Sequence, residues 1–448
     1  MTSLWETVAS RGASGRGAFH APTASVELLR LASASCLGGR LESLRGRSIL
    51  LTMREQLSTA LALLELDGVA RRLVLCTPEL TPETLAEVAH TAGTGVQLAD
   101  LDPVPVAADV DRQATIATEW ILLTSGTTGT PKLVAHTLSS LAGALPRQPP
   151  GTSMVWSTFY DIRRYGGLQI YLRAVLGGTP LVLSSPGEST ADFLVRAGAH
   201  GVTHISGTPS HWRRALMSGA ARSLRPEYVR LSGEVADQGL LDQLHGAYPN
   251  ARVAHAFAST EAGVAFDVND GHAGFPADYL EKPRDGIEMK VEDGTLRIRS
   301  HRTAARYLGS AASQLCSQDG FVDTGDLVEL KDGRYYFRGR RGGVINVGGL
   351  KVYPEEVEGV LNADPRVRMS LVRPKRSPIT GAIVVAEVVL EDLVGKALDA
   401  SQTEHIKTEL LEACRRALPA HKVPARLRFV PSLKLSAAGK LVRPQEFA

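Results

Sequence analysis

The chain has 448 residues, of which 44% are hydrophobic and 22% are charged, and its formal net charge is +3. A chain of this length and composition can bury a large core, which excludes a disordered, collagen-like or disulfide-scaffold protein. The small net charge gives no reason to expect nucleic acid as a partner.

The cysteines and the apolar residues indicate the cellular compartment of the protein. The four cysteines, Cys36, Cys76, Cys316 and Cys414, form no CxxC pair, which argues against a zinc or redox motif and favours a reducing cytoplasm. No apolar run approaches the ~20 residues that span a membrane, and the N-terminal residues lack the pattern of a signal peptide. We therefore expect a cytoplasmic protein with no membrane partner.

Short apolar strands alternate with helical segments in the first part of the chain. Such alternation predicts βαβ units and a largely parallel sheet, with ligands bound outside the carboxyl ends of the strands. Strands are predicted over 48–52, 72–76, 181–183, 202–205, 228–231 and 252–257, and helices over 55–66, 191–197 and 237–247.

The pattern changes after about residue 280, where Asp-Gly pairs separate short strands and predict hairpins. Beyond about residue 340 a compact α+β pattern follows, with a strand over 344–347, a helix that begins at Pro354 and another over 401–418. Ser401 is the expected N-cap of that last helix. We predict an α/β fold with two domains, 1–340 with mostly parallel sheets and a small β region, and a small 341–448 domain.

A glycine-rich loop follows the predicted strand over 120–123. Its backbone N–H groups and hydroxyls can wrap a polyphosphate, and its lysine adds a positive charge. The spacing differs from that of a Walker loop, and a polar surface turn is the alternative interpretation. The candidate ligands in this loop are Thr124, Ser125, Gly126, Thr127, Thr128, Gly129 and Lys132.

Residues 124–132 resemble the phosphate loop of the adenylate-forming enzymes, a superfamily of acyl- and aryl-CoA synthetases, carrier-protein-loading adenylation domains and luciferases. The other motifs of that superfamily follow in its order, so that the resemblance extends from about residue 115 to the end. It implies a large adenylation domain over 1–340 that binds ATP and the acid. It also implies that the 341–448 domain is mobile and carries the catalytic lysine.

The resemblance assigns the segment 256–261 to the nucleotide. It implies that Phe257 stacks on adenine, that Thr260 contacts the phosphate and acts in catalysis, and that Glu261 is catalytic and holds Mg²⁺. A carboxylate is a hard oxygen ligand that suits Mg²⁺ shared with phosphates. Gly233 and Glu234 resemble the segment that lies along the adenine. The sequence departs from the family with Phe257 where Tyr is commoner.

Further motifs indicate residues that bind the ribose, form the hinge and line the thiol tunnel. By resemblance, Asp326 accepts hydrogen bonds from the ribose hydroxyls, which suits an ionised carboxylate, and Arg340 contacts the ribose or phosphate. Gly342 stands at the hinge, where the family usually has Asp or Lys. Gly348 and Gly349 are expected to line the thiol tunnel.

The last motif, 436–443, contains Lys440. The resemblance implies that Lys440 bridges the acid carboxylate and the α-phosphate, offsetting charge on both as the carboxylate attacks phosphorus. The acid-binding segment, 156–167, matches the family loosely. In it Arg163 or Arg164 either faces a second carboxylate of the substrate or is solvated.

These motifs predict an ATP-dependent acid–thiol ligase that activates a small carboxylic acid as acyl-AMP and transfers it to a pantetheine thiol. The cofactors implied are ATP, Mg²⁺ and coenzyme A, with the phosphopantetheine of an acyl carrier protein as the other candidate acceptor. One alternative is an adenylating enzyme that passes the acyl group to a non-thiol nucleophile. The other is a non-catalytic nucleotide-binding protein.

Overall fold

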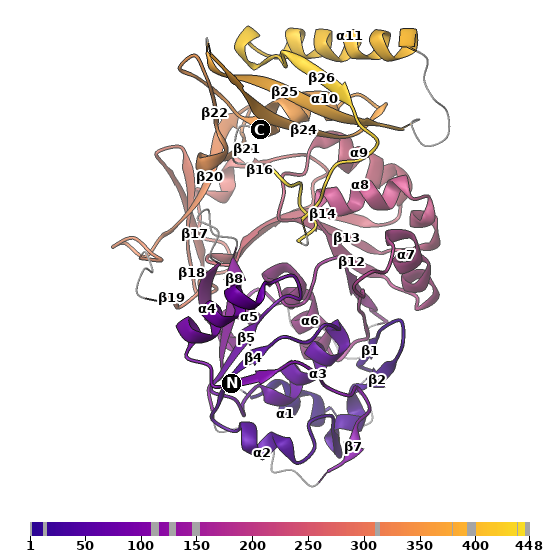
Figure 1. Ribbon diagram of the computed structural model, residues 1–448, viewed down its shortest axis with the longest axis vertical. Coiled ribbons are helices and arrows are strands. Elements are labelled where there is room, and N and C mark those ends of the chain that lie inside the picture. Colours follow the sequence, from indigo (N-terminus) through magenta and orange to yellow (C-terminus); the bar gives the residue numbers. More distant parts are fainter. Residues whose placement is uncertain are drawn as a thin grey trace.

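The computed structural model describes residues 2–11, 16–108, 116–124, 131–145, 153–309, 314–378, 380–391, 400–436 and 438–443. Three large sheets build the chain up to residue 340, and the C-terminal part lies at one end of the molecule (Figure 1, orange to yellow). The predicted α/β fold class is confirmed.

The largest sheet is mostly parallel, with the strand order β15-β14-β13-β12-β10-β11-β1-β2. Its strands are β1 (Ala18–His20), β2 (Ser25–Glu27), β10 (Trp156–Thr158), β11 (Leu181–Val182), β12 (His204–Gly207), β13 (Tyr228–Ser232), β14 (Arg252–Ser259) and β15 (Gly263–Val268). The six inner strands run parallel, and the edge strands β2 and β15 are antiparallel to their neighbours. Because β13 and β14 are parallel neighbours, their carboxyl ends lie next to each other at the same end of the strands, which we call the carboxyl edge of the sheet.

A second sheet has the order β19-β9-β8-β5-β4-β6. Its strands are β4 (Ser48–Leu51), β5 (Arg72–Leu75), β6 (Val96–Leu98), β8 (Glu119–Thr124), β9 (Lys132–Thr137) and β19 (Arg306–Leu308). The helix α3 (Gln56–Leu66) is buried along its whole length, in a hydrophobic core shared by the two sheets. A two-stranded ribbon joins β3 (Ala34–Ser35) to β7 (Val106–Ala107).

The remaining helices before residue 280 pack around these sheets (Figure 1). They are α1 (Leu4–Ala9), α2 (Arg40–Leu44), α4 (Pro82–Ala92), α5 (Leu138–Ala142), α6 (Tyr165–Gly177), α7 (Thr190–Ala199), α8 (Pro209–Met217) and α9 (Gln238–Ala247), with the 3₁₀ turns η2 (Leu28–Ala32), η3 (Ala220–Ser223) and η4 (Ala277–Tyr279). The predicted strands and helices of this region are confirmed, with ends that differ by a few residues.

The third sheet is antiparallel and contains the predicted hairpins. Its strands, in the order β16-β21-β20-β18-β17, are β16 (Phe275–Pro276), β17 (Ile287–Glu292), β18 (Thr295–Ser300), β20 (Val322–Lys331) and β21 (Arg334–Arg340). The turns of two hairpins have positive φ at both central residues, 53° and 75° at Asp293 and Gly294, and 50° and 74° at Asp332 and Gly333. Asp and Gly tolerate this conformation, which is why Asp-Gly pairs indicated the hairpins.

The C-terminal part has a hydrophobic core of its own, which includes Val357, Val388 and Cys414. Its elements are η5 (Arg341–Gly343), β22 (Ile345–Val347), β23 (Leu350–Val352), α10 (Pro354–Asn362), β24 (Val367–Ser377), β25 (Gly381–Leu390), α11 (Ala400–Ala417), η7 (Ala420–Lys422) and β26 (Arg426–Phe429). The expected N-cap role of Ser401 is wrong, because Ser401 lies inside α11.

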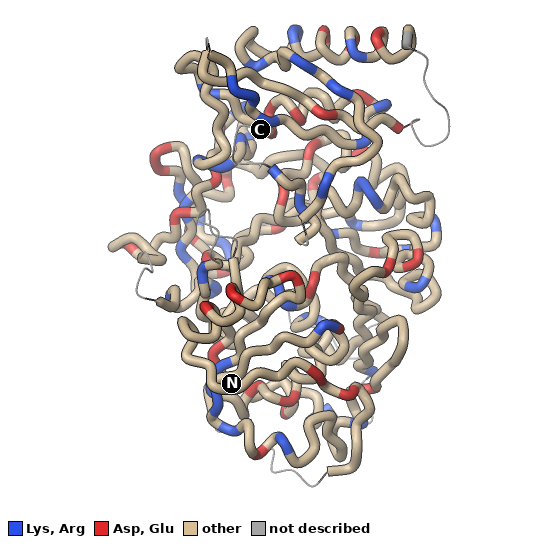
Figure 2. Tube along the Cα trace, viewed as in Figure 1, with Lys and Arg blue, Asp and Glu red and all other residues tan. Residues whose placement is uncertain are grey.

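Charges of both signs are spread over the molecule, and basic and acidic residues alternate along α11 (Figure 2). Within the described residues, no helix combines the length and apolar character that crossing a membrane requires.

Candidate active site

A cavity of about 3350 Å³ lies where the carboxyl edge of the largest sheet, the third sheet and the C-terminal part meet. Most of the candidate site residues line it, although they come from segments far apart in the sequence. These residues are Thr124, Lys132, Gly233, Glu234, Phe257, Thr260, Glu261, Asp326, Arg340, Gly342, Gly349 and Lys440. Ser125, Gly126, Thr127, Thr128 and Gly129 lie outside the described residues.

The two ends of the glycine-rich loop stand side by side. Thr124 ends β8 and Lys132 begins β9, and the two residues are paired across this antiparallel hairpin. The ammonium nitrogen of Lys132 lies 5.1 Å from the ring centroid of Tyr307. A cation over an aromatic ring is attracted to it, so Tyr307 holds the Lys132 side chain at the cavity wall.

Glu261 and Thr260 are fixed by two residues that the sequence analysis did not identify. The hydroxyl of Tyr307 lies 3.2 Å from Oε1 of Glu261 and donates to it. Nε2 of His136 lies 2.7 Å from the carbonyl oxygen of Thr260. Because a carbonyl only accepts, Nε2 of His136 carries the proton, and burial lowers the pKa of this imidazole to about 4. His136 is therefore a neutral donor that anchors the Thr260–Glu261 segment.

Phe257 lies in an aromatic cluster. Its ring is nearly parallel to that of Phe337, with centroids 5.1 Å apart and an interplanar angle of 9°. It also stacks on Phe266 at 5.9 Å. Phe337 lies on β21 and lines the cavity beside Phe257, and it had not been identified from the sequence.

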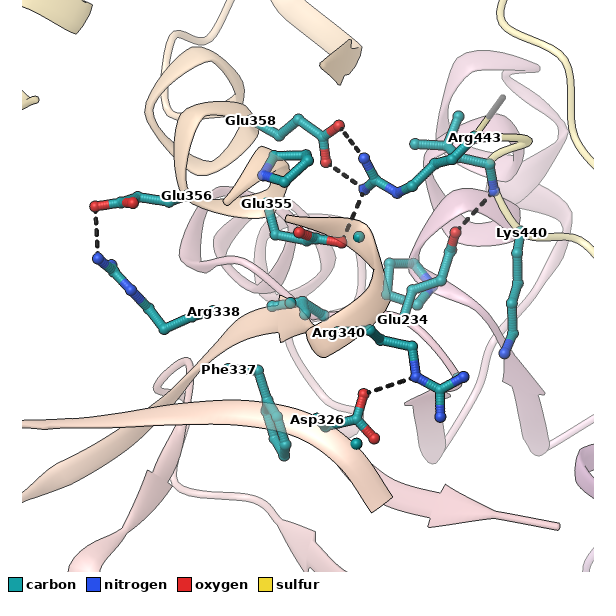
Figure 3. Close-up of a pocket in the computed structure, with 18 of the residues that line it drawn as sticks. Glu234, Asp326, Phe337, Arg338, Arg340, Glu355, Glu356, Glu358, Lys440 and Arg443 are labelled. Atoms are coloured by element: carbon teal, nitrogen blue, oxygen red, sulfur yellow. Dashed lines mark hydrogen bonds and ion pairs between the residues drawn. The ribbon is translucent and has the colours of Figure 1, made fainter. Parts of the chain in front are cut away.

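Asp326 and Arg340 form a cross-strand pair on β20 and β21. Nε of Arg340 lies 3.2 Å from Oδ1 of Asp326 (Figure 3). Nη2 of Arg340 donates to the carbonyl of Thr324. Burial raises the pKa of the Asp326 carboxyl, and the positive charge of Arg340 opposes this shift. A hydrogen-bond acceptor and a cation thus share one wall of the cavity.

Lys440 extends from the C-terminal loop into the cavity, toward Arg340 and Asp326 (Figure 3). Enclosure by the cavity walls lowers the pKa of its ammonium group, and this shift is opposed by Glu234 and Asp326. The preceding Gly439 has φ of +68°, and a Cβ there would lie 1.8 Å from Cε1 of His211. Only glycine fits this position without a shift of the loop or of His211.

The expected hinge and thiol-tunnel glycines lie in the first elements of the C-terminal part. Gly342 is the middle residue of η5, outside the positive-φ region, and a Cβ there would meet no atom within 4 Å. Gly348 and Gly349 form the turn between β22 and β23, with φ of 58° and 87°. Gly349 lines the cavity, and Gly348 packs near the side chain of Thr380.

The two arginines of the acid-binding segment, Arg163 and Arg164, have different surroundings. Arg163 is 2% exposed, and its guanidinium is paired with Asp161 and donates to the carbonyl of Met53. This rules out the hypothesis that Arg163 faces a substrate carboxylate. Arg164 is paired with Glu79 and lines the cavity, so of the two arginines it is the one that a substrate can reach.

Tyr160 also lines the cavity, and its hydroxyl donates to the carbonyl oxygen of Ser232 at 2.7 Å. This bond fixes the loop that precedes α6 against the end of β13. The acid-binding segment is thus tied to the segment that carries Gly233 and Glu234.

Sequence profiles match both parts of the chain. The family described as AMP-binding enzyme matches residues 46–303, and the AMP-binding enzyme C-terminal domain matches residues 356–440. The 2-succinylbenzoate–CoA ligase of Salmonella typhimurium is 27% identical over 384 residues, which cover 82% of this chain and 80% of that protein.

Solved structures share the whole fold. E. coli MenE with bound OSB-AMS is similar with a TM-score of 0.77 and 21% identity, over 96% of each chain. The amide bond synthetase McbA from Marinactinospora thermotolerans is similar with a TM-score of 0.73 and 20% identity, over 98% of this chain and 97% of that one.

Proposed function

Because this chain belongs to the AMP-binding enzyme family, as its motifs predicted, we propose that it is an ATP-dependent acid–thiol ligase. It activates a small carboxylic acid as an acyl adenylate and transfers the acyl group to a pantetheine thiol. The observation that carries this proposal is the position of Lys440, which extends from the C-terminal part into the cavity that Lys132, Glu261 and Asp326 line.

In the first half-reaction, a carboxylate oxygen of the acid attacks the α-phosphorus of ATP. The bond to the bridging oxygen breaks, and pyrophosphate leaves with the electron pair. Lys440 offsets the negative charge on both the attacking carboxylate and the α-phosphate. Lys132 and the backbone of the glycine-rich loop hold the leaving phosphates, and Asp326 accepts hydrogen bonds from the ribose. The enzyme contributes positioning and charge stabilisation in this step.

The carboxylate of Glu261 fits a magnesium site that the nucleotide completes. Among the described residues, no group of three or more His, Cys, Asp or Glu side chains is arranged to hold a metal. A single carboxylate suits Mg²⁺, which is usually held by one or two carboxylates together with substrate phosphates. Bound there, Mg²⁺ supplies neutralisation of the phosphate charge. Tyr307 donates to one oxygen of Glu261 and orients the carboxylate.

In the second half-reaction, a thiolate sulfur attacks the acyl carbon and AMP leaves. The C-terminal part, residues 341–448, rotates about Gly342 between the two steps, carries Lys440 away and brings Gly348 and Gly349 to the thiol. Coenzyme A is the favoured acceptor, and the CoA ligase from Salmonella typhimurium supports this choice. A carrier protein is the second candidate acceptor.

A second candidate function keeps the first half-reaction and passes the acyl group to an amine. The similarity to an amide bond synthetase over nearly the whole chain favours this alternative over others. A non-catalytic role is disfavoured, because Lys132, Glu261 and Lys440 line one cavity.

The test is acid-dependent exchange of radiolabelled pyrophosphate into ATP, measured with Mg²⁺ and a panel of carboxylic acids. We expect exchange with at least one acid, and formation of its CoA thioester when CoA is added. Exchange without thioester, but with amide when amines are supplied, supports the second candidate. Folded protein that exchanges with no acid of a broad panel contradicts both functions.

A further inference from the structure

Two residues of the N-terminal part hold the backbone on either side of Lys440. The hydroxyl of Thr208 donates to the carbonyl oxygen of Gly439 at 2.6 Å. On the other side, the N–H of Leu441 donates to Oε1 of Glu234 at 2.9 Å. The peptide units immediately before and after Lys440 are thus both attached to residues more than 200 positions earlier in the chain.

The second oxygen of Glu234 is also engaged. Oε2 accepts a hydrogen bond of 3.0 Å from the N–H of Ser210, in the first turn of α8. Glu234 therefore connects the N-terminus of α8 with the loop that carries Lys440 (Figure 3). Carboxylates suit the N-termini of helices, and hydrogen bonds to ionised acceptors are stronger than neutral ones.

Contacts around Lys440 restrict the direction in which its side chain can point. Gly439 lies against the ring of His211, and a Cβ on Gly233 would lie 3.2 Å from Cε of Lys440. With both flanking peptides anchored and the side chain passing Gly233, the ammonium group is directed toward Asp326 and Arg340 (Figure 3).

A different contact holds the same loop to the C-terminal part. Arg443 donates from Nη1 and Nη2 to the two oxygens of Glu358, both at 2.7 Å, and Glu358 lies on α10. Arg443 and Glu358 both belong to the predicted 341–448 domain, so this ion pair moves with the loop when that domain moves. The bonds from Thr208 and Glu234 cross between the two predicted domains, so a rotation breaks them.

We propose that Glu234 is a positioning residue of the adenylation step, which with Thr208 holds Lys440 in the cavity in this orientation and releases it when the C-terminal part turns. The inference rests on the proposed function. It gives the Glu234 carboxylate a role toward the Lys440 loop, beyond the contact with adenine expected from sequence.

The test measures the two half-reactions separately on folded Glu234→Gln and Thr208→Val. Glutamine keeps the shape but presents an amide N–H to one of the two backbone N–H groups, and valine removes the hydroxyl. We expect pyrophosphate exchange to fall roughly tenfold to a hundredfold, in kcat more than in the KM for ATP. Thioester formation from a supplied acyl adenylate should stay within about twofold of wild type. Thr208→Ser, which keeps the donor, should restore exchange.

A double variant distinguishes positioning of Lys440 from general damage. If Glu234 acts through Lys440, adding Glu234→Gln to Lys440→Ala should cause little further loss of exchange, because coupled residues are not additive. Glu227→Gln, at an exposed glutamate outside the cavity lining, is the matched control and should change neither half-reaction. Independent, multiplicative losses, or equal loss of both half-reactions, would overturn the proposal.

Hydrogen–deuterium exchange gives a readout that needs no substrate. The peptide spanning residues 438–443 should exchange faster in Glu234→Gln than in wild type, while peptides of β24 and β25 stay unchanged. Unchanged protection of this peptide in Glu234→Gln would overturn the proposal. If wild type shows no pyrophosphate exchange with any acid, the proposed function fails, and the deuterium measurement alone decides the anchoring of the loop.

Discussion

Nε2 of His136 donates a hydrogen bond of 2.7 Å to the carbonyl oxygen of Thr260, across 124 residues of sequence. Nδ1 of the same ring lies 2.9 Å from the hydroxyl of Ser140, and the residue is 1% exposed. The imidazole therefore joins β9, at the end of the glycine-rich loop, to the segment that carries Glu261. His136 is not among the residues that line the cavity, yet it fixes the position of Thr260 and Glu261.

Replacing His136 should affect both activity and stability. In His136→Phe the carbonyl of Thr260 loses its donor, which we expect to cost about 1–3 kcal/mol of unfolding free energy. Pyrophosphate exchange should fall because Glu261 is displaced. His136→Gln retains an N–H donor and should recover part of both losses, whereas His90→Phe, at an exposed histidine on α4, should change neither. Urea unfolding and exchange assays on all three variants check this, and normal exchange in His136→Phe would contradict it.

Gly439 should tolerate no side chain. Its φ is +68°, and an added Cβ would lie 1.8 Å from Cε1 of His211. We expect Gly439→Ala to displace Lys440 and to reduce pyrophosphate exchange by about 10² or more, as loss of a preorganised charge does. His211→Ala in the same chain removes the clash and should restore part of the rate, leaving the cost of positive φ, about 1 kcal/mol.

The control for Gly439 is Gly246→Ala, where a new Cβ meets no atom within 4 Å. This variant should exchange at the wild-type rate. If Gly439→Ala also exchanges at the wild-type rate, the loop does not need the close approach to His211.

Gly342 tests the hinge. A Cβ at this position would meet no atom within 4 Å, and its φ is not positive, so alanine fits the present orientation. Proline fixes φ near −65°, and a rotation about this residue changes its backbone angles. We expect Gly342→Pro to keep pyrophosphate exchange and to lose most thioester formation, while Gly342→Ala keeps both. Equal effects of proline on the two half-reactions, or none, would place the pivot elsewhere.

Buried histidines make the protein sensitive to mild acid. Burial lowers the pKa of His136, His204 and His211 to about 4 each. The unfolded chain binds these protons at a pKa near 6.5, so their contribution to stability is present above pH 6.5 and is lost as pH falls toward 4. Burial of Asp67 raises its pKa to about 6 and acts in the opposite direction, because the folded state takes up that proton first.

The pKa values of His20 and His255 are also lowered, and those of the Asp326 and Glu355 carboxyls are also raised, in each case chiefly by burial. Five histidines against three carboxyl groups predict a net loss of unfolding free energy between pH 6.5 and 4, with each group changing it by up to about 1.4 kcal/mol per pH unit. Urea unfolding at pH 7.5, 6 and 5 measures this dependence. Asp67→Asn removes the opposing carboxyl and should make the decline steeper. A free energy that stays level from pH 7.5 to pH 5 would contradict the assignment of neutral, buried imidazoles.

Much of this fold could be predicted because its strands are short apolar runs that end in turn residues. The strand 228–231 and the Asp293–Gly294 turn are examples in which local chemistry determines local structure. Glu234 and Glu261 could be placed together because they follow the carboxyl ends of the parallel neighbours β13 and β14. Asp326, inside β20, and Lys440, in the C-terminal loop, were assigned by resemblance alone. Arg163 could have been assigned to a structural role, since Asp161 stands two residues before it.

Other site residues carried no local signal. Tyr307 reaches Glu261 only because β19 pairs with β9, which joins residues about 170 positions apart. Thr208 reads as an ordinary N-cap of α8, and it is one, since its hydroxyl accepts from the N–H of His211 at 3.0 Å. The hydrogen bond from its hydroxyl to the carbonyl oxygen of Gly439 depends on how the C-terminal part packs against α8. The pattern of apolar residues in the sequence does not predict this packing.

The most direct test of the account is the effect of Lys440→Ala on the two half-reactions. Acid-dependent ATP–pyrophosphate exchange should fall by about 10² or more, because the group that offsets charge on the carboxylate and the α-phosphate is gone. The same variant should still convert a supplied acyl adenylate to its CoA thioester at nearly the wild-type rate, since in the proposed reaction the C-terminal part carries Lys440 out of the cavity before the thiol attacks. Equal loss of both half-reactions, or full exchange without the lysine, would contradict a role of Lys440 confined to adenylation.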